Sequence, residues 1–537
     1  MNRRSFLAFL PSSAALAAQR TQTRPSNGNA QDAPPFELDE ITIDDLSRGM
    51  QSGKYTARRV TELYLARIEA TNRRGPMLRA VIETNPDAPA IADKLDAERR
   101  QGAVRGPMHG IPVLLKANIG TADRTHTSAG SLALADWSPP KDAFIVAQLR
   151  DSGAVLLGKS NLSEWAGSRG AGRIGGWSGV GGQTRNPYVL DRSPQGSSAG
   201  SGVGVAANLC SVAVGTDTGG SITYPAAVCG IVGLRPTLGM LSRAGIIPLS
   251  LTRDTAGPMG RTVRDVAILL GAMTGIDAAD PMTAPNRPEP MKDYTRFLDP
   301  GGLKGARLVV AREYFGGHPG SDMVIEAAMK VLRDQGAELF DQPDGLSTEP
   351  YQSESRILSN HDMKAELNRY LSQLPEHFPV RTLAQLVEFN ERNRDRELQF
   401  YGQSALIAAE KAPPVSEERY LAAREKCWRL SRDEGIDAIL KKHRADAIIA
   451  PSLTPSFVTD FVMGDGRTVA CTIPACTAGY PHLNVPAGFV HGLPVTLSFF
   501  STAWSEPALL RLGYAFEQAT KARRKPEFLP TLAFPET

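Results

Sequence analysis

Apolar residues recur along the chain at two spacings, one typical of helices and one typical of strands. Val60, Leu63, Tyr64 and Ile68 lie three or four residues apart and predict a helix over about residues 56–72. Short apolar runs flanked by glycine or charged residues predict strands at Arg79–Glu83, Gly110–Asn118, Ala154–Leu157, Arg307–Ala311, Ala337–Phe340 and Ala447–Ala450. Because the two patterns alternate, we expect an α/β fold.

Cap and turn residues mark the ends of further helices. One helix is expected over Pro86–Gln101, another from Ser321, and a third behind Asp142, which is placed to cap it, with Gly153 at its end. Between about 355 and 434 the chain reads as successive helices, placed to pack across a cleft as a lid. A hairpin with strands at Leu483–Pro486 and Pro494–Phe500, and a last helix carrying Leu509, Leu512 and Phe516, complete the pattern.

The first nineteen residues depart from this globular pattern. They begin with basic residues, continue with a short apolar run and end in small residues near Ala17, an order typical of a cleavable export signal. Asn2-Arg3-Arg4-Ser5-Phe6-Leu7 resembles a twin-arginine signal, which implies export to the bacterial periplasm or secretion. The apolar run is too short for a permanent membrane anchor. Residues 20–35 are expected to form a flexible linker, and 36–537 a single domain.

Composition and charge exclude several classes of protein. The 537 residues are 42% hydrophobic and 22% charged, as in ordinary globular proteins, and the formal net charge of +3 favours neither nucleic acid nor an anionic membrane as a partner. The five cysteines are an odd, sparse set without C-x-x-C spacing, so they predict neither a disulfide framework nor a metal site. A bridge between Cys471 and Cys476 stays open.

Two common motif formulas match the chain but lack their structural context. Gly153-Ala-Val-Leu-Leu-Gly-Lys-Ser160 fits the phosphate-loop formula, yet its apolar middle favours a buried strand. Gly196-Ser-Ser198-Ala-Gly200 fits the nucleophile elbow of a Ser-His-Asp α/β-hydrolase, with His482 or His491 as the later histidine. That elbow requires a preceding strand, whereas residues 185–195 read as a loop.

A set of segments in a fixed order carries a stronger signal. They are Gly110–Lys116, Gly153–Glu164, Gly196–Ser201, Gly215–Ile222, Pro225–Pro236, Asp254–Met259, Ala478–Pro481 and Val485–Gly488. In sequence and order they resemble the amidase signature family of serine hydrolases, over roughly residue 36 to the end. The resemblance implies the fold of that family, a large mixed twisted β-sheet covered by helices on both faces in a single catalytic domain, with no metal and no cofactor.

The resemblance also implies the site residues. The family works with a Ser-cisSer-Lys triad, which by motif makes Ser221 the nucleophile, Ser197 the bridging serine held by a cis peptide and Lys116 the base. The two serines lie 24 positions apart, as in the family. The N–H groups of Thr218, Gly219, Gly220 and Ser221 would receive the oxyanion. Thr223 stands where the family commonly has arginine, so the partner of Asp217 is left open.

The residue types fit this chemistry without the family name. A serine hydroxyl needs a base, and a lysine is a base only when it is neutral. Burial disfavours the ammonium form, and Lys116 follows the apolar run Val113–Leu115, where its pKa would fall towards neutrality. Taken alone, Lys116 would be a strand-end lysine and Ser221 a helix cap; the matched order and spacing favour the catalytic interpretation.

We therefore expect an exported serine amidase that hydrolyses a small-molecule or peptide carboxamide to acid and ammonia through an acyl-enzyme. Gly176–Tyr188 and Asn208–Cys210 look most like the peptide amidases, which remove C-terminal amides. The alternatives are a glutaminase subunit of a tRNA-dependent amidotransferase, a Ser-His-Asp α/β-hydrolase and a non-catalytic amidase-like binding scaffold.

Overall fold

The computed structural model describes residues 34–284 and 288–532. The expected export signal (1–19) and residues 20–33 of the expected linker lie outside the described residues. Within those ranges, no helix combines the length and apolar character needed to cross a bilayer.

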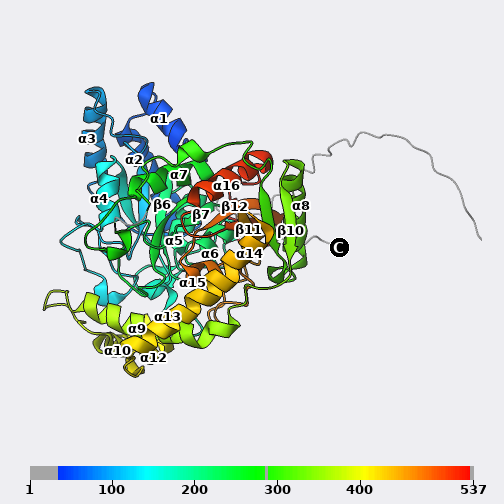
Figure 1. Cartoon of the computed structure of the whole chain (residues 1–537). Helices are drawn as coiled ribbons and strands as arrows, with labels where there is room; N and C mark the ends of the chain where they lie inside the picture. The colour runs from blue at the N-terminus through cyan, green and yellow to red at the C-terminus, as the bar shows by residue number, and fades with distance from the viewer. Residues whose placement is uncertain (1–33, 285–287, 533–537) are drawn as a thin grey trace, which may run out of the picture.

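A twisted sheet of eleven strands runs through the centre of the described part of the chain (Figure 1). Its order is β1-β3-β2-β6-β8-β7-β12-β13-β11-β9-β10, and it is mixed, because β2 runs parallel to β3 and β6 whereas β8 runs antiparallel to β6. The strands are β1 Val81–Thr84, β2 Pro112–Lys116, β3 Val155–Ser160, β6 Val212–Asp217, β7 Val232–Arg235, β8 Thr255–Gly260, β9 Arg307–Ala311, β10 Glu338–Gln342, β11 Ala447–Pro451, β12 His482–Val490 and β13 Leu493–Phe500. A separate two-stranded ribbon pairs β4 (Trp177–Ser178) with β5 (Gly182–Gln183).

Helices cover both faces of this sheet. On β12, Leu483 and Val485 contact Gly513 of α16, whereas Asn484 pairs with Gly233 of β7, which faces Ala226 of α6. Since neighbouring residues of a strand point to opposite faces, α16 and α6 lie on opposite sides. The helices are α1 Ile43–Gln51, α2 Ala57–Arg67, α3 Ala88–Arg100, α4 Phe144–Asp151, α5 Ala199–Ala206, α6 Thr223–Val228, α7 Val263–Met273, α8 Pro319–Asp334, α9 Gln352–Leu371, α10 Leu383–Arg392, α11 Arg394–Glu397, α12 Ser404–Lys411, α13 Glu417–Ser431, α14 Asp437–His443, α15 Ile473–Ala478 and α16 Glu506–Thr520.

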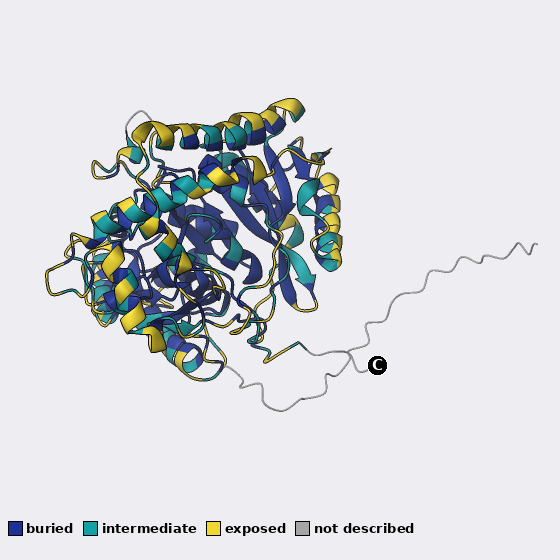
Figure 2. Cartoon of the chain, turned by 90° about the horizontal axis from the view of Figure 1, so that it is seen from below, coloured by how far each residue is buried: buried dark blue, intermediate teal, exposed yellow. Residues whose placement is uncertain are grey.

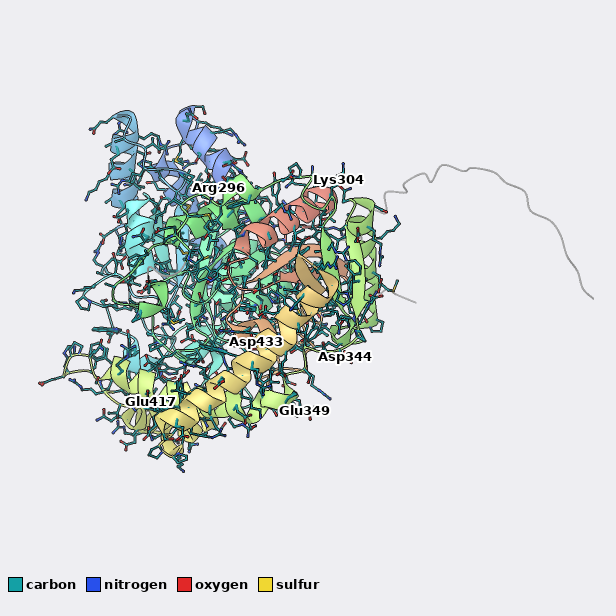
Figure 3. The ribbon with its side chains drawn as sticks, in the orientation of Figure 1. Arg296, Lys304, Asp344, Glu349, Glu417 and Asp433 are labelled. Atoms are coloured by element: carbon teal, nitrogen blue, oxygen red, sulfur yellow. The ribbon has the colours of Figure 1, made fainter. Side chains whose placement is uncertain are left out.

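The helices α9 to α13 gather at one side of the sheet, which we call the helical region (residues 352–431; Figure 1). Leu367, Leu371, Leu383 and Leu406 of this region form an apolar cluster with Trp165 from the sheet-bearing part. Figure 2 shows the central strands buried and the outer faces of the helices exposed. The charged side chains labelled in Figure 3, such as Glu417 and Asp433, lie at the periphery and are exposed, so these charges stay solvated.

The α/β fold with a large mixed sheet is confirmed, and so are most predicted elements. The helix at 56–72 is α2, capped by Thr56 and continued by a wider turn over Ile68–Arg73. The predicted hairpin is β12–β13, and His491 and Gly492 at its turn have positive φ angles of 48° and 83°.

Three local predictions are wrong. Asp142 does not cap α4, since Ala143 holds the cap position without a side-chain bond; the Asp142 carboxylate accepts from the Ala122 N–H at 2.7 Å and pairs with Arg150. The helix expected from Ser321 begins at Pro319, because the His318 ring accepts the Ser321 N–H as its cap. Arg79 lies outside the first strand, with φ of 49°.

All five cysteines are buried free thiols, and Cys471 and Cys476 are not bridged. Cys471 Sγ lies 3.9 Å from the carbonyl oxygen of Ser452, and Cys476 Sγ lies 3.3 Å from Asp217 Oδ1. The thiols therefore serve as core residues.

Candidate active site

Lys116 is the last residue of β2, a strand buried at every position between its neighbours β3 and β6. Its side chain is fully buried. The Nζ atom donates to Ser197 Oγ at 2.7 Å, to Thr216 Oγ1 at 2.8 Å and to the Thr216 carbonyl at 3.2 Å. Because β2 and β6 are parallel, their carboxyl ends bring Lys116 and Thr216 together although they are 100 positions apart.

Burial lowers the pKa of Lys116 to about 7, against the opposing attraction of the Asp217 and Asp254 carboxylates. A substantial share of neutral amine is therefore present near neutral pH. A neutral amine that hydrogen-bonds a serine hydroxyl can accept its proton.

Ser197 lies between the lysine and a small pocket. The peptide bond from Gly196 to Ser197 is cis, and the Ser197 carbonyl accepts the Ser163 N–H at 3.0 Å. The side chain is 2% exposed. When Lys116 is an ammonium, the Ser197 hydroxyl accepts from Nζ; when the amine is neutral, Nζ can accept the Ser197 proton, which leaves Ser197 Oγ able to accept a proton from the pocket.

Ser221 lies in the turn between β6 and α6 and lines the same pocket as Ser197. It is partly exposed, unlike Ser197 and Lys116. Among the described residues its hydroxyl has no hydrogen-bond partner. The structure thus brings the three expected residues together around one pocket, with the lysine-to-Ser197 hydrogen bond formed and the Ser197-to-Ser221 bond not formed. Such contacts often tighten only when substrate binds.

Asp217 shapes the turn that carries Ser221. Its carboxylate accepts the N–H groups of Gly220 at 2.9 Å and Ile222 at 2.7 Å, and the guanidinium of Arg235 at 2.8 Å. Burial alone would raise the pKa of Asp217, but Arg235 and these N–H groups outweigh it and lower the pKa below its ordinary value. The Asp217 carboxylate therefore stays ionised.

The Gly220 N–H, expected to be an oxyanion donor, is occupied by Asp217. The expectation is corrected at this residue, because an amide bonded to a carboxylate is not available to an oxyanion. The other expected donors are Thr218, Gly219 and Ser221, whose N–H groups have no hydrogen-bond partner in the part of the chain that the structure describes.

Sequence reasoning missed three residues of this site. Arg235 is the partner that the sequence left open for Asp217; it lay within the Pro225–Pro236 motif. Thr216 bonds Lys116, and Asp254, within another matched motif, accepts from Thr218 Oγ1 at 2.6 Å. All three residues lie within motifs that match the family, which is the signal that could have identified them. Their contacts could not be predicted, because they join separate elements of the fold.

The nucleophile-elbow interpretation of Ser198 does not fit the structure. The Ser198 hydroxyl is fully buried and donates to the Thr216 carbonyl at 3.0 Å. The His482 ring bonds Ser498 Oγ at 2.6 Å instead. The phosphate-loop formula likewise falls on the buried strand β3. No cluster of three His, Cys, Asp or Glu side chains within the described ranges is arranged to hold a metal ion.

Two cavities of very different size share Ala166 as a lining residue. The pocket at Ser197 and Ser221 holds about 20 Å³. The neighbouring cavity holds about 430 Å³ and reaches from Thr216 and Thr218 to α9 of the helical region, where Glu366 and Tyr370 line it. The helical region thus forms a wall of the larger cavity.

The site thus combines a mixed α/β sheet, a buried lysine bonded to a serine and an open serine in a strand-to-helix turn, an arrangement compatible with a hydrolase that pairs serine with lysine. The comparisons with known proteins give the family. The chain belongs to the amidase family, whose model matches residues 59–510.

Three relatives show how close the similarity is. The crystal structure of native peptide amidase from Stenotrophomonas maltophilia is 46% identical, with a TM-score of 0.87, and the match covers 92% of this chain and all of that one. A probable amidase from Arabidopsis thaliana is 38% identical over 92% of this chain and 93% of its own length. A glutamyl-tRNA(Gln) amidotransferase subunit from Alkalilimnicola ehrlichii is 33% identical over 91% of this chain and 99% of its own. The protein is accordingly an amidase-family hydrolase that acts on amides.

Proposed function

We propose that the protein hydrolyses a primary carboxamide, in particular the C-terminal amide of a peptide, to a carboxylic acid and ammonia through an acyl-enzyme on Ser221. The observation that carries the proposal is the 2.7 Å hydrogen bond from the buried Lys116 amine to Ser197, beside the pocket that Ser221 lines. The 46% identity to a peptide amidase supports the substrate class.

The proposed reaction moves one proton along the three residues. Ser221 Oγ bonds to the carbonyl carbon, its proton passes to Ser197, and the Ser197 proton passes to the neutral Lys116 amine. The N–H groups of Thr218, Gly219 and Ser221 are the candidates to stabilise the oxyanion. The lysine then returns the proton through Ser197 to the leaving nitrogen, and ammonia departs. Water attacks the Ser221 ester with the same base and releases the acid.

The sizes of the two cavities support ammonia as the leaving group. A space of about 20 Å³ beside Ser221 matches a group of the size of ammonia or water, whereas the cavity of about 430 Å³ matches the acyl part of a short peptide. We therefore place the acyl chain in the large cavity and the amide nitrogen in the small pocket.

Ammonia release from a panel of peptide amides, aliphatic and aryl amides and free glutamine tests this function. We expect peptide amides to be the best substrates. Hydrolysis of glutamine alone would instead assign the protein to the amidotransferase-type glutaminases, to which it is also related.

The nucleophile is tested separately with a fluorophosphonate probe. The wild-type protein and Ser198→Ala should be labelled, and Ser221→Ala should not. Labelling that survives in Ser221→Ala, or no labelling of the wild type, would refute the assignment.

We also propose that the protein is exported to the periplasm or secreted, which rests on the basic, apolar and small-residue order of residues 1–19. Replacement of Arg3 and Arg4 by lysine should retain the protein in the cytoplasm of a bacterial host, as measured by fractionation. Unchanged export of that variant would argue against a twin-arginine route.

A further inference from the structure

Two carboxylic acids meet inside the molecule next to the active site, away from the three proposed catalytic residues. Glu164 begins the turn η3 (Glu164–Gly167), and Glu397 ends α11 of the helical region. Both side chains and that of Arg169 between them are fully buried. Arg169 Nη1 lies 2.9 Å from Glu164 Oε1 and 3.9 Å from Glu397 Oε2.

Three of the four carboxyl oxygens have hydrogen-bond donors. Glu164 Oε1 accepts from Arg169, and Glu164 Oε2 accepts the Gly179 N–H at 2.8 Å. Glu397 Oε1 accepts the Leu132 N–H at 2.6 Å and the Ser131 hydroxyl at 3.2 Å. Glu397 Oε2 has no hydrogen-bond partner among the described residues. Buried polar atoms are rarely left without a partner, so this oxygen requires an explanation.

The position of Gly179 shows what the unpartnered oxygen faces. A Cβ atom on Gly179 would lie 2.7 Å from Glu397 Oε2 and 3.1 Å from Glu164 Oε2, so the two oxygens border the same small space. If both groups were ionised, two carboxylates and one guanidinium would bury a net negative charge, which is costly. One proton makes the three groups neutral and supplies the missing donor.

We propose that Glu164 and Glu397 share one proton, with Glu397 Oε2–H donating to the Glu164 carboxylate, and that this bond is a positioning clamp between the helical region and the wall of the active site. Burial and the neighbouring Glu397 charge raise the pKa of Glu164 well above its ordinary value, against the opposing charge of Arg169. The raised pKa therefore favours retention of one proton by the pair.

The clamp positions Ala166, which lines both the Ser221 pocket and the large cavity. Trp165 and Ala166 have φ angles of 48° and 52°, a conformation that side-chain-bearing residues adopt only when their surroundings hold them. Glu164 fixes the start of this turn. Arg169 fixes its end, since it also donates to the backbone carbonyls of Glu397 and Tyr401.

The proton makes the clamp sensitive to pH in one direction. The closed form binds the proton more tightly than an open form, in which the carboxyl groups are solvated. The ratio of open to closed form therefore rises by up to about tenfold per pH unit between the ordinary carboxyl pKa and the raised pKa of the closed pair. The other titratable groups that face the pair are Arg169 and the Tyr401 phenol, whose pKa burial raises further. Arg173 and Asp465 lie beyond Tyr401 and pair with each other. Closure is thus lost as pH rises.

Two glutamine substitutions test the orientation of the shared proton. In Glu397→Gln the amide N–H₂ takes the place of the proposed O–H, donates to Glu164 at every pH and leaves Glu164 paired with Arg169. In Glu164→Gln the amide N–H₂ has to face either Arg169 or the Gly179 N–H, both of which are donors. The first variant should keep activity and the second should lose it, although both remove one carboxyl.

The experiment measures amide hydrogen exchange over residues 394–411 between pH 6 and 9, as protection relative to the unfolded-chain rate at each pH, together with kcat/KM. In the wild type, protection should fall with pH, by up to about tenfold per unit. In Glu397→Gln protection should not change with pH, and the alkaline loss of kcat/KM should disappear. In Glu397→Ala the clamp should be open at every pH. Glu388→Gln, at an exposed position on α10, is the matched control and should behave as the wild type.

A wild-type protection that does not depend on pH, or the same pH dependence in Glu397→Gln as in the wild type, would overturn the proposal. So would a Glu397→Ala variant as active as Glu397→Gln. The kcat/KM arm rests on the proposed amidase function. The exchange arm needs no substrate, so a failure of the clamp and a failure of the proposed function can be told apart.

Discussion

The ends of the neighbouring strands β2 and β3 each carry a buried lysine with the same pKa and different surroundings. Burial lowers the pKa of both Lys116 and Lys159 to about 7. Lys159 pairs in register with Leu115, so it points to the opposite face of the sheet from Lys116. Its amine donates to the Ile119 carbonyl at 2.5 Å and to Thr127 Oγ1 at 3.1 Å.

The difference lies in the partners. Lys116 bonds a serine that lines a pocket, whereas Lys159 bonds a backbone carbonyl and a buried threonine. A lowered pKa makes a lysine able to act as a base, but only an adjacent proton donor at a substrate pocket gives it a proton to accept. The comparison therefore supports Lys116 as the proposed base and favours a structural role for Lys159.

The largest predicted effect separates the two lysines directly. Lys116→Met should lower kcat/KM for an amide by about 10³–10⁴, because the nucleophile loses its base while the binding cavity stays intact. Lys159→Met should keep kcat/KM within about threefold and lower the free energy of unfolding by about 1–3 kcal/mol, because the Ile119 carbonyl and Thr127 hydroxyl lose the amine and keep only their mutual hydrogen bond at 3.5 Å. Initial rates and urea unfolding of both variants check this. Equal losses of kcat/KM would remove the distinction between them.

The charges around the two lysines also differ, which gives a second prediction. Arg235 pairs with Asp217 beside Lys116, with both side chains fully buried. Arg235→Met should lower the free energy of unfolding by about 3–5 kcal/mol, because it leaves the Asp217 carboxylate buried without its partner. Urea unfolding measures the loss. Arg235→Met/Asp217→Asn should recover part of it, and a single variant as stable as the wild type would refute the pairing.

The sequence was informative where the function depends on neighbouring residues in the chain. The run Val113–Leu115 before Lys116 predicts a buried strand and a lysine with a lowered pKa, and the strand-helix alternation followed from local patterns. The mixed sheet and the shared site of Ser197 and Ser221 were implied by the resemblance to the amidase signature family.

Contacts between separate strands could not be predicted in this way. Arg235 meets Asp217 because β7 and β6 both pair with β8, which no local pattern encodes. The Gly220 amide looked available because the motif does not show that the Asp217 carboxylate turns back to accept it. Asp142 has the residue type of a helix cap, but Arg150 and the Ala122 N–H take its carboxylate instead. Tertiary partners outweighed local propensity at each of these positions.

A pH profile gives a third and smaller effect, about tenfold per pH unit. Since only the neutral amine of Lys116 accepts a proton, kcat/KM of Glu397→Gln, in which the clamp stays closed at every pH, should rise with pH and reach half of its plateau near pH 7. Lys159→Met should leave this midpoint unchanged, because Lys159 touches neither Ser197 nor Thr216. Rates from pH 5 to 8 with a non-ionising peptide amide test it. A rate of Glu397→Gln that falls from pH 6 to 7 would exclude lysine as the base.

The smallest effect is expected at Ser198, which shares the Thr216 carbonyl with Lys116. Ser198→Ala removes one hydroxyl donor from that carbonyl but leaves the lysine bonded to it, so the unfolding free energy should fall by about 1 kcal/mol and kcat/KM should change less than about threefold. Ser197→Ala, one position earlier, removes the hydroxyl between Lys116 and the pocket and should lower kcat/KM by at least about a hundredfold. Parallel kinetics of the two alanine variants measure the contrast. If Ser198→Ala proved the more damaging, proton transfer would have to run through Ser198 and Thr216, and the contacts of Lys116 would no longer identify Ser197 as the relay.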